Sequence, residues 1–339
     1  MRHLILLAVT AILLATPAPA GIMRHDLPWS DYETYGQTDP KFGASLWVGV
    51  WHSDGTHRYG TMTAIASGSP DSFWGVSAAH VFEGLDGYGG DITDMKVRYG
   101  TNGLTNYSVE VDVIQFVLHP EWDPQYAEWN TTDLVLVEFE IIPDVTPIGR
   151  FIEFVQRDTF LNMGGYGTPG YPDTGPDVYD GEKRGGDNIL YKYGGDLGYS
   201  QIDSSYMMLD FGLVDVQPLE YHVWLGDSGS GWLLDGAGEW QLAGVTSFWW
   251  GGFDNGSSSG VLSLYEFNSW IDTILAAAGI PGECEDADLD ADSDCDLADF
   301  AAFQQAFTGP GRAVRSGGGK LHWTNCEPMK HRRELYKFP

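Results

Sequence analysis

Cysteine is scarce in this sequence of 339 residues. Only three cysteines occur, and all of them lie after residue 283. The large body of the chain, residues 21–282, therefore has no disulfide bond, and the packing of its apolar side chains has to provide its stability. Cys284, Cys295 and Cys326 allow three pairings, and the sequence does not choose among them.

Basic residues are also few. The chain has 18 Lys and Arg against 48 Asp and Glu, which gives a formal net charge of −30. Such a surface repels nucleic acid and anionic lipid, so neither is an expected partner. The charge is unevenly distributed: residues 283–299 hold nine acids and no base, whereas residues 312–339 hold seven bases and two acids. This basic tail contains no motif that indicates a function.

Long apolar runs are missing, and the one near the start is short. A basic start of three residues is followed by twelve almost wholly apolar residues, 4–15, and then by the small residues Ala18 and Ala20. Twelve apolar residues are fewer than the about 20 that span a bilayer. We therefore expect a cleaved signal peptide at 1–20, an exported protein that is secreted or held at the cell surface, and no membrane span.

Glycine and aromatic residues, in contrast, are abundant, with 44 glycines and 14% aromatics. The glycines separate short apolar runs, as in a turn-rich β protein. Segments that alternate apolar and polar residues, or are rich in β-branched residues, predict two sets of strands: 44–51, 61–66, 108–114 and 134–139, then 205–210, 231–234 and 240–246. Apolar residues at helical spacing from Leu264 to Leu275, ended by Gly279 and Pro281, predict one closing helix.

Three short motifs contain residues suited to nucleophilic catalysis. Ser228 lies in Gly-Asp-Ser-Gly-Ser, where glycines permit a sharp turn with N–H groups directed at an attacked carbonyl. A serine hydroxyl needs an adjacent base, and His80, which ends Val-Ser-Ala-Ala-His, can take its proton. Asp133 precedes an apolar strand and can hold the other ring nitrogen. Each motif alone is also typical of an ordinary turn or strand end.

The order of these residues, His-Asp-Ser, resembles that of the chymotrypsin and trypsin family of serine proteases. Ser-Ala-Ala-His at His80 is similar to the family's Thr-Ala-Ala-His, Asp-Leu-Val-Leu at Asp133 to Asp-Ile-Ala-Leu, and Gly-Asp-Ser-Gly at Ser228 to the nucleophile signature. Three further segments resemble the family's Gly-Trp-Gly strand, its substrate-binding strand and its closing helix: 162–167, 244–248 and 268–274. The resemblance spans about residues 40–278.

This resemblance implies an all-β fold for a protease domain at 21–280. Two six-stranded antiparallel β-barrels are expected at about 40–145 and 146–263, followed by a C-terminal helix at 264–279. The catalytic cleft is expected between the two barrels, with His80 and Asp133 on the first barrel and Ser228 on the second.

The resemblance also implies how the serine loop is built. The backbone N–H groups of Gly226 and Ser228 are expected to form an oxyanion hole. Asp227 corresponds to the family's acid that pairs with a new N-terminal ammonium group after zymogen cleavage. This sequence lacks the family's Ile-Val-Gly-Gly start, and Gly21 or Ile22, next to the signal cleavage site, are the nearest candidates.

Four residues are expected to contact substrate by the same resemblance. Ser247 and Phe248 lie in the segment similar to the substrate-binding strand, and His222 lies six residues before the nucleophile, at the base of the primary pocket. An acid at that base would attract Lys or Arg, and His222 carries no such charge. Trp249 stands where a glycine would leave the pocket open. We therefore expect protein or peptide substrates, cleaved poorly after Lys and Arg and better after small, apolar or acidic residues.

The segment 288–299 has the spacing of a calcium-binding loop. Acids at positions 1, 3, 5, 9 and 12 and a carbonyl at position 7 supply the oxygen ligands that Ca²⁺ requires; the residues are Asp288, Asp290, Asp292, Asp294, Asp296 and Asp299. Three phenylalanines on one helical face follow the loop, at 300, 303 and 307. The alternative is a disordered acidic linker, which the strict alternation and this helical pattern disfavour.

Residues 282–311 resemble one half of a dockerin-like, EF-hand-related repeat of bacterial exported proteins. The resemblance implies a small α-helical module with a scaffold or cell-surface partner. Ser293 replaces the usual turn glycine and a second loop is absent, which argues against the usual cohesin partner.

The sequence therefore predicts a secreted serine endopeptidase that forms an acyl-enzyme through Ser228, His80 and Asp133. Ca²⁺ is expected in the C-terminal loop alone and is not required for the chemistry. The alternative is a catalytically weak, protease-like binding protein displayed through the calcium module. An esterase on the same scaffold is the third possibility.

Overall fold

The structure is a computed structural model. It describes residues 21–66, 72–83, 90–126, 129, 131–196, 198–212, 217–252 and 256–278. The expected signal peptide, the calcium ligands (Asp288, Asp290, Asp292, Asp294, Asp296 and Asp299), the dockerin-like module and the basic tail lie outside these residues, and they remain predictions from the sequence.

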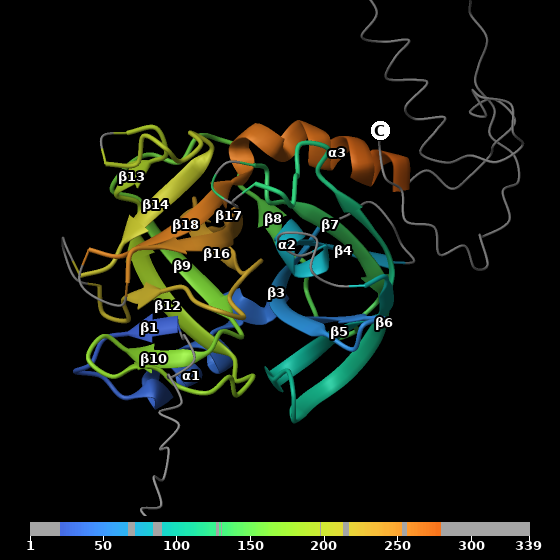
Figure 1. The fold of residues 1–339 in the computed structure, drawn as a ribbon, viewed down its shortest axis with the longest axis horizontal. Coiled ribbons are helices and arrows are strands. Elements are labelled where there is room, and N and C mark those ends of the chain that lie inside the picture. The colour runs from blue at the N-terminus through green and yellow to red at the C-terminus, as the bar shows by residue number, and fades with distance from the viewer. Residues whose placement is uncertain are drawn as a thin grey trace, which may run out of the picture.

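The first half of the chain forms a closed, six-stranded antiparallel β-barrel (Figure 1). The strands pair in the order β2-β3-β4-β7-β6-β5, with the bounds β2 Ser45–His52, β3 His57–Ile65, β4 Ser72–Ser77, β5 Ile92–Asn102, β6 Asn106–Leu118 and β7 Val135–Glu140. Aliphatic side chains from these strands fill the interior, among them Leu46, Val48, Val97, Val135 and Val137. The first of the two expected barrels is thereby confirmed.

The second half forms an eight-stranded sheet. Its order is β12-β9-β16-β17-β18-β14-β13, with β8 paired to β17; the bounds are β8 Gly149–Arg150, β9 Phe160–Gly165, β12 Arg184–Ile189, β13 Lys192–Tyr193, β14 Tyr206–Asp210, β16 Gly231–Gly236, β17 Glu239–Trp250 and β18 Ser258–Ser263. Among the described residues the end strands β12 and β13 do not pair with each other. The second six-stranded barrel that was expected is not shown in the described residues: the strands of this half pair as one sheet, and Asp187 of β12 makes one further isolated bridge, to Glu220.

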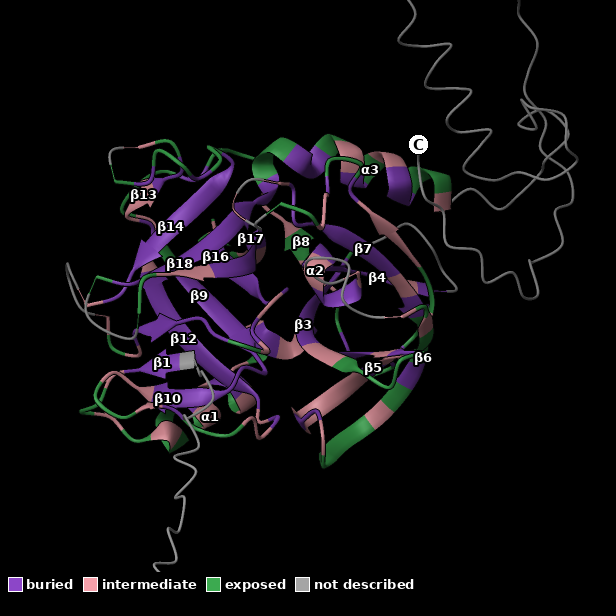
Figure 2. Ribbon diagram, viewed as in Figure 1, coloured by how far each residue is buried: buried purple, intermediate pink, exposed green. Residues whose placement is uncertain are grey.

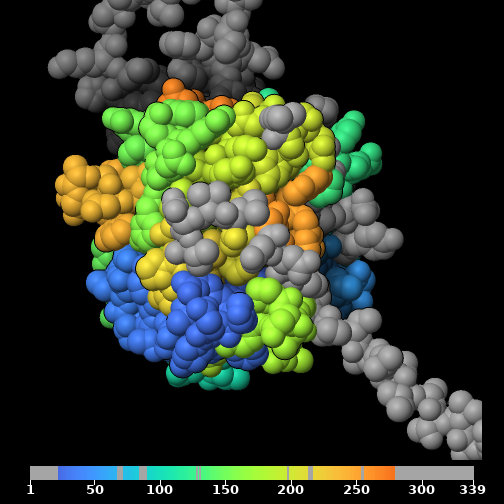
Figure 3. Space-filling view, turned by 90° about the vertical axis from the view of Figure 1, so that its left-hand side faces the viewer, coloured from blue at the N-terminus to red at the C-terminus, as the bar shows by residue number. Residues whose placement is uncertain are grey.

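A four-stranded sheet lies beside β12, in the order β11-β10-β1-β15. Its strands are short: β1 Gly21–Met23, β10 Pro169–Tyr171, β11 Gly175–Pro176 and β15 Tyr221–His222. The helix α1 Trp29–Thr38 and the 3₁₀ turn η1 Pro40–Ala44 then connect β1 to the barrel. Figure 3 shows this N-terminal part, in blue, against yellow and yellow-green segments of the second half. A side chain at Gly36 would collide with the backbone of Arg184, so glycine lets α1 pack closely on β12.

The chain ends, within its described part, on the 3₁₀ turn η3 Leu264–Phe267 and the helix α3 Asn268–Ala278. The predicted closing helix is confirmed, and Ile271, Ile274 and Leu275 form its buried face. These side chains join a core that contains residues of both halves, including Trp74 and Phe248. Figure 2 shows buried residues along the strands of both halves and exposed ones on the outer part of β6. No helix among the described residues is long and apolar enough to cross a membrane.

Candidate active site

His80 is positioned by the junction of β4 and a short helix, α2 Ala79–Phe82. Its backbone N–H donates to Asp133 Oδ1 at 2.9 Å, and its ring Nδ1 lies 2.7 Å from Asp133 Oδ2. Two contacts with one carboxylate fix both the main chain and the ring orientation. The imidazole side chain keeps 16% of its surface exposed, so its other nitrogen is accessible from the surface.

Asp133 lies just before β7 and is fully buried. Besides the two His80 contacts, its Oδ2 accepts a hydrogen bond from the hydroxyl of Ser247 on β17. A buried carboxylate requires such donors, because it has lost its water. Ser247, which the sequence placed at a substrate-binding strand, is therefore a partner of Asp133, and it joins the second half of the molecule to the first.

Ser228 lies in the turn between β15 and β16, and its Oγ is 2.7 Å from His80 Nε2. Thr61 of β3 holds this turn against the barrel: its N–H donates to Ser228 O at 2.8 Å and its hydroxyl to Gly226 O at 2.9 Å. Gly226 and Gly229 have φ of +94° and +84°. A Cβ on Gly229 would lie 2.1 Å from Thr61 O, so the close approach of the two halves requires glycine there.

Two backbone N–H groups beside Ser228 point away from the protein's own acceptors. Within the described part of the chain, the N–H groups of Gly226 and Ser228 donate to no protein acceptor, whereas Asp227, Gly229 and Ser230 donate to backbone carbonyls. Both residues are half-buried rather than enclosed. Two free N–H groups next to a serine hydroxyl are the arrangement needed to bind a developing oxyanion.

Asp227 is fully buried behind these two groups. Its carboxylate accepts three hydrogen bonds, each 3.0 Å long, from Gly167 N, Tyr221 Oη and Trp224 N. Burial raises the pKa of Asp227 to about 7, although these donors oppose the shift. In the described residues the Asp227 carboxylate forms no ion pair. Neutral donors hold it, in place of the N-terminal ammonium group that the family resemblance implied.

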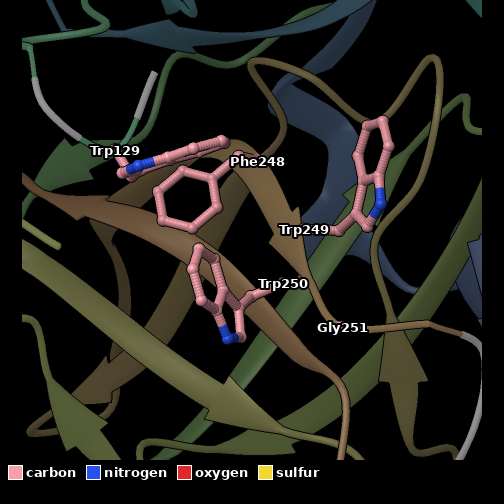
Figure 4. Close-up of a pocket in the computed structure, with 5 residues that line it drawn as sticks. All are labelled: Trp129, Phe248, Trp249, Trp250 and Gly251. Atoms are coloured by element: carbon pink, nitrogen blue, oxygen red, sulfur yellow. The ribbon is translucent and has the colours of Figure 1, made fainter. Parts of the chain in front are cut away.

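An open cavity of about 530 Å³ is lined by Trp129, Phe248, Trp249, Trp250 and Gly251 (Figure 4). Trp129 contacts Phe248 and Trp250 edge to face, at ring-centroid distances of 5.8 and 5.7 Å. Phe248 and Trp250 are two positions apart on β17, so they face the same side of the strand. Trp129 lies four residues before Asp133, and Phe248 directly follows Ser247, whose hydroxyl donates to Asp133.

Trp249 faces the other side of β17, and Figure 4 shows it apart from the other three rings. It packs against Trp224 with the ring centroids 4.0 Å apart and the planes tilted by 38°. Trp224 also contacts His222 edge to face, at 6.4 Å. His222 is fully buried, has Nδ1 3.1 Å from Ser259 Oγ, and does not line the cavity. Burial lowers the pKa of His222 to about 3, so the ring is neutral.

The structure brings together the predicted residues His80, Asp133, Ser228 and Gly226, and it places Phe248 and Trp249 at the cavity. Sequence reasoning missed Thr61, Tyr221 and Trp129, which touch the site through tertiary contacts. None of the three lies in a motif. Only Trp129 had a local signal, an aromatic residue close to Asp133.

No group of three or more His, Cys, Asp or Glu side chains in the described segments is arranged to hold a metal ion. Comparison with known proteins finds no matching family model and no similar curated protein. The function therefore has to be inferred from the residues and their geometry.

Proposed function

We propose that this chain is an exported serine endopeptidase of the chymotrypsin type, with Ser228 as nucleophile, His80 as base and Asp133 as the residue that orients the base. One observation carries the proposal: Ser228 Oγ, His80 Nε2, His80 Nδ1 and Asp133 Oδ2 form a continuous chain with both contacts at 2.7 Å. The partners are 148 and 53 positions apart in the sequence. An ordinary turn at Ser228 or strand end at Asp133 has no reason to produce this alignment.

The geometry supports acyl transfer in two stages. In the first stage Ser228 Oγ attacks the substrate carbonyl while its proton passes to His80 Nε2, and Asp133 stabilises the imidazolium. The N–H groups of Gly226 and Ser228 donate hydrogen bonds to the negatively charged carbonyl oxygen, and removing one such donor typically costs about 3 kcal/mol. His80 then gives the proton to the leaving amine, and water, activated by the same base, hydrolyses the acyl-enzyme.

The surroundings of Ser228 support a substrate with apolar side chains. We propose that the packed rings of Trp224 and Trp249 narrow the pocket for the side chain before the cleaved bond, and neutral, buried His222 offers Lys or Arg no charge. Beside it, the cavity of Trp129, Phe248 and Trp250 presents aromatic faces to an apolar substrate side chain. We therefore propose poor cleavage after Lys and Arg and a preference for small or apolar residues.

The broader setting agrees with this proposal. A β-rich chain with one closed six-stranded barrel and a C-terminal helix is compatible with the chymotrypsin-like fold. The apolar N-terminal segment supports export, and the 288–299 loop supports a calcium-dependent attachment to a scaffold or cell surface.

Labelling with a fluorophosphonate tests the proposed nucleophile. Wild-type protein should be labelled at Ser228, and Ser228→Ala and His80→Ala should lose labelling and about 10⁶-fold in peptide turnover. Ser230→Ala is the matched control, because its hydroxyl contacts Thr246 instead of His80. Labelling that persists in Ser228→Ala would refute the assignment. If the folded wild-type protein takes no label, the result supports the alternative of a binding protein. If it hydrolyses esters but not peptides, the result supports an esterase.

A further inference from the structure

The Asp227 carboxylate is held from two separate segments of the chain. Gly167 follows β9, and its N–H donates to Oδ1; Tyr221 lies on β15, and its hydroxyl donates to Oδ2. The fit is close at both sites. A Cβ on Gly167 would lie 2.2 Å from the carboxylate, and one on Gly186 would lie 2.2 Å from Tyr221 Cβ. Glycines thus allow both donor segments to reach Asp227.

The strand β1 joins these two segments. It pairs with β10, which begins two residues after Gly167, in the register Gly21–Pro169 and Ile22–Gly170. On its other side it pairs with β15, in the register Ile22–His222 and Met23–Tyr221. Ile22 and Met23 are fully buried. In the described part of the chain β1 is the strand between β10 and β15, and two hydrogen bonds from Thr168 to Leu225 O also join the segments.

Asp227 also lies between Gly226 and Ser228, the two residues with free backbone N–H groups. Its own N–H donates to Trp224 O at 2.9 Å, and its carbonyl accepts from Ser230 N at 2.8 Å. The position of its side chain therefore determines the direction of the Gly226 and Ser228 N–H groups. A shift of the carboxylate would turn these groups away from the oxygen they are proposed to bind.

We propose that Tyr221 is a positioning residue for Ser228, and that β1 keeps it in place by pairing with β15 and β10. This inference rests on the proposed endopeptidase function. In this chain the strand β1 and the hydroxyl of Tyr221 order the serine loop.

The charge around Asp227 makes this arrangement sensitive to pH. Tyr221 on β15, Tyr179 before β12 and Arg184 on β12 are the titratable groups near the carboxylate. Arg184 is itself paired with Asp180 and Glu33. Because the pKa of Asp227 is about 7, loss of the Tyr221 hydrogen bond should raise it further and leave more of the acid protonated at neutral pH.

The test is Tyr221→Phe, which removes only the hydroxyl. We expect kcat for a peptide substrate to fall about 10- to 100-fold with KM nearly unchanged, as for an interaction made in the transition state. The acidic limb of the kcat profile should move to higher pH, because Asp227 must be ionised to accept all three donors. The difference between the two profiles reports on Asp227, because the variant removes the hydroxyl that donates to this carboxylate.

Tyr199→Phe is the matched control. Its hydroxyl also donates to a buried aspartate, Asp210, at 2.6 Å, and burial also raises the pKa of that acid. This variant should lose stability while keeping kcat and its pH profile. If Tyr221→Phe behaves like Tyr199→Phe, the positioning role of Tyr221 is refuted although wild-type labelling at Ser228 still supports the protease. If the wild type itself lacks labelling, the proposed function has failed instead.

Ile22→Ala tests the role of β1, with Ile271→Ala in α3 as control, since both side chains are fully buried. At equal measured stability, Ile22→Ala should slow fluorophosphonate labelling of the folded protein and Ile271→Ala should not. Equal labelling rates in the two variants would refute the role of β1. Should Ile22→Ala fail to fold, Tyr221→Phe alone decides the proposal.

Discussion

Replacing Trp249 by alanine should change which side chain the proposed protease accepts before the cleaved bond. The variant removes one ring of the Trp224 and Trp249 pair, whose centroids are 4.0 Å apart. Such an aromatic pair contributes about 0.5–1.5 kcal/mol beyond its buried area, so a moderate loss of stability is expected. The vacated space would be bounded by Trp224, so it suits an apolar guest.

The size of the change follows from the area that the guest would bury. Fully burying a phenylalanine side chain contributes about 1.5–3 kcal/mol, which corresponds to roughly a 10- to 100-fold increase in kcat/KM for a Phe substrate relative to an Ala substrate. A Lys substrate should gain little, because neutral His222 offers it no charge. Three peptides that differ only in the residue before the cleaved bond, Ala, Phe or Lys, measure these ratios.

Trp250→Ala is the control for this experiment. Trp250 is adjacent in sequence but faces the cavity with Phe248, on the other side of β17. It should weaken binding of apolar substrate side chains at the cavity and leave the Phe to Ala ratio unchanged. An unchanged ratio in Trp249→Ala, or the same increase in both variants, would show that the Trp224 and Trp249 pair does not narrow the primary pocket.

Two further predictions concern charge. Burial lowers the pKa of His222 to about 3, so this side chain stays neutral in the folded protein. In the unfolded chain it binds a proton below about pH 6.5. The free energy of unfolding should therefore fall as the pH drops from about 6.5 toward 3, by at most about 1.4 kcal/mol per pH unit. Urea titrations should show a flatter dependence in His222→Leu, and an unchanged slope would contradict this. The full chain should bind Ca²⁺ in calorimetry and lose that binding in Asp288→Ala; absence of heat from the wild type at millimolar Ca²⁺ would reject the site.

The sequence predicted most of the longer strands, because their side chains alternate between core and surface. The strand predicted at 61–66 overlaps β3, and the one at 134–139 overlaps β7. The closing helix was also predictable from its apolar spacing. His80, Asp133 and Ser228 were identifiable because each lies in a local motif and their order along the chain is informative.

The four-stranded sheet was not predictable in the same way. β1 has three residues and β15 has two, which is too short for any periodicity, and their pairing joins positions about 200 residues apart. Whether the second half closes into a barrel depends on which edge strands pair with each other. The alternation of apolar and polar residues predicts where strands lie but does not predict their pairing. Spacing from Ser228 and Ser247 identified His222 and Trp249 as candidate pocket residues. It did not show that His222 is fully buried or that Trp249 packs against Trp224.

The two hydrogen bonds from Thr61 to the serine loop divide the proposed machinery between the two halves. The base and its orienting acid belong to the barrel, the nucleophile belongs to the eight-stranded sheet, and Thr61 fastens one to the other at Gly226 O and Ser228 O. A chain cut in the connector between β7 and β8 would thus carry base and nucleophile on separate fragments. Peptide hydrolysis by the mixed fragments would then report their association, and each fragment alone should be inactive.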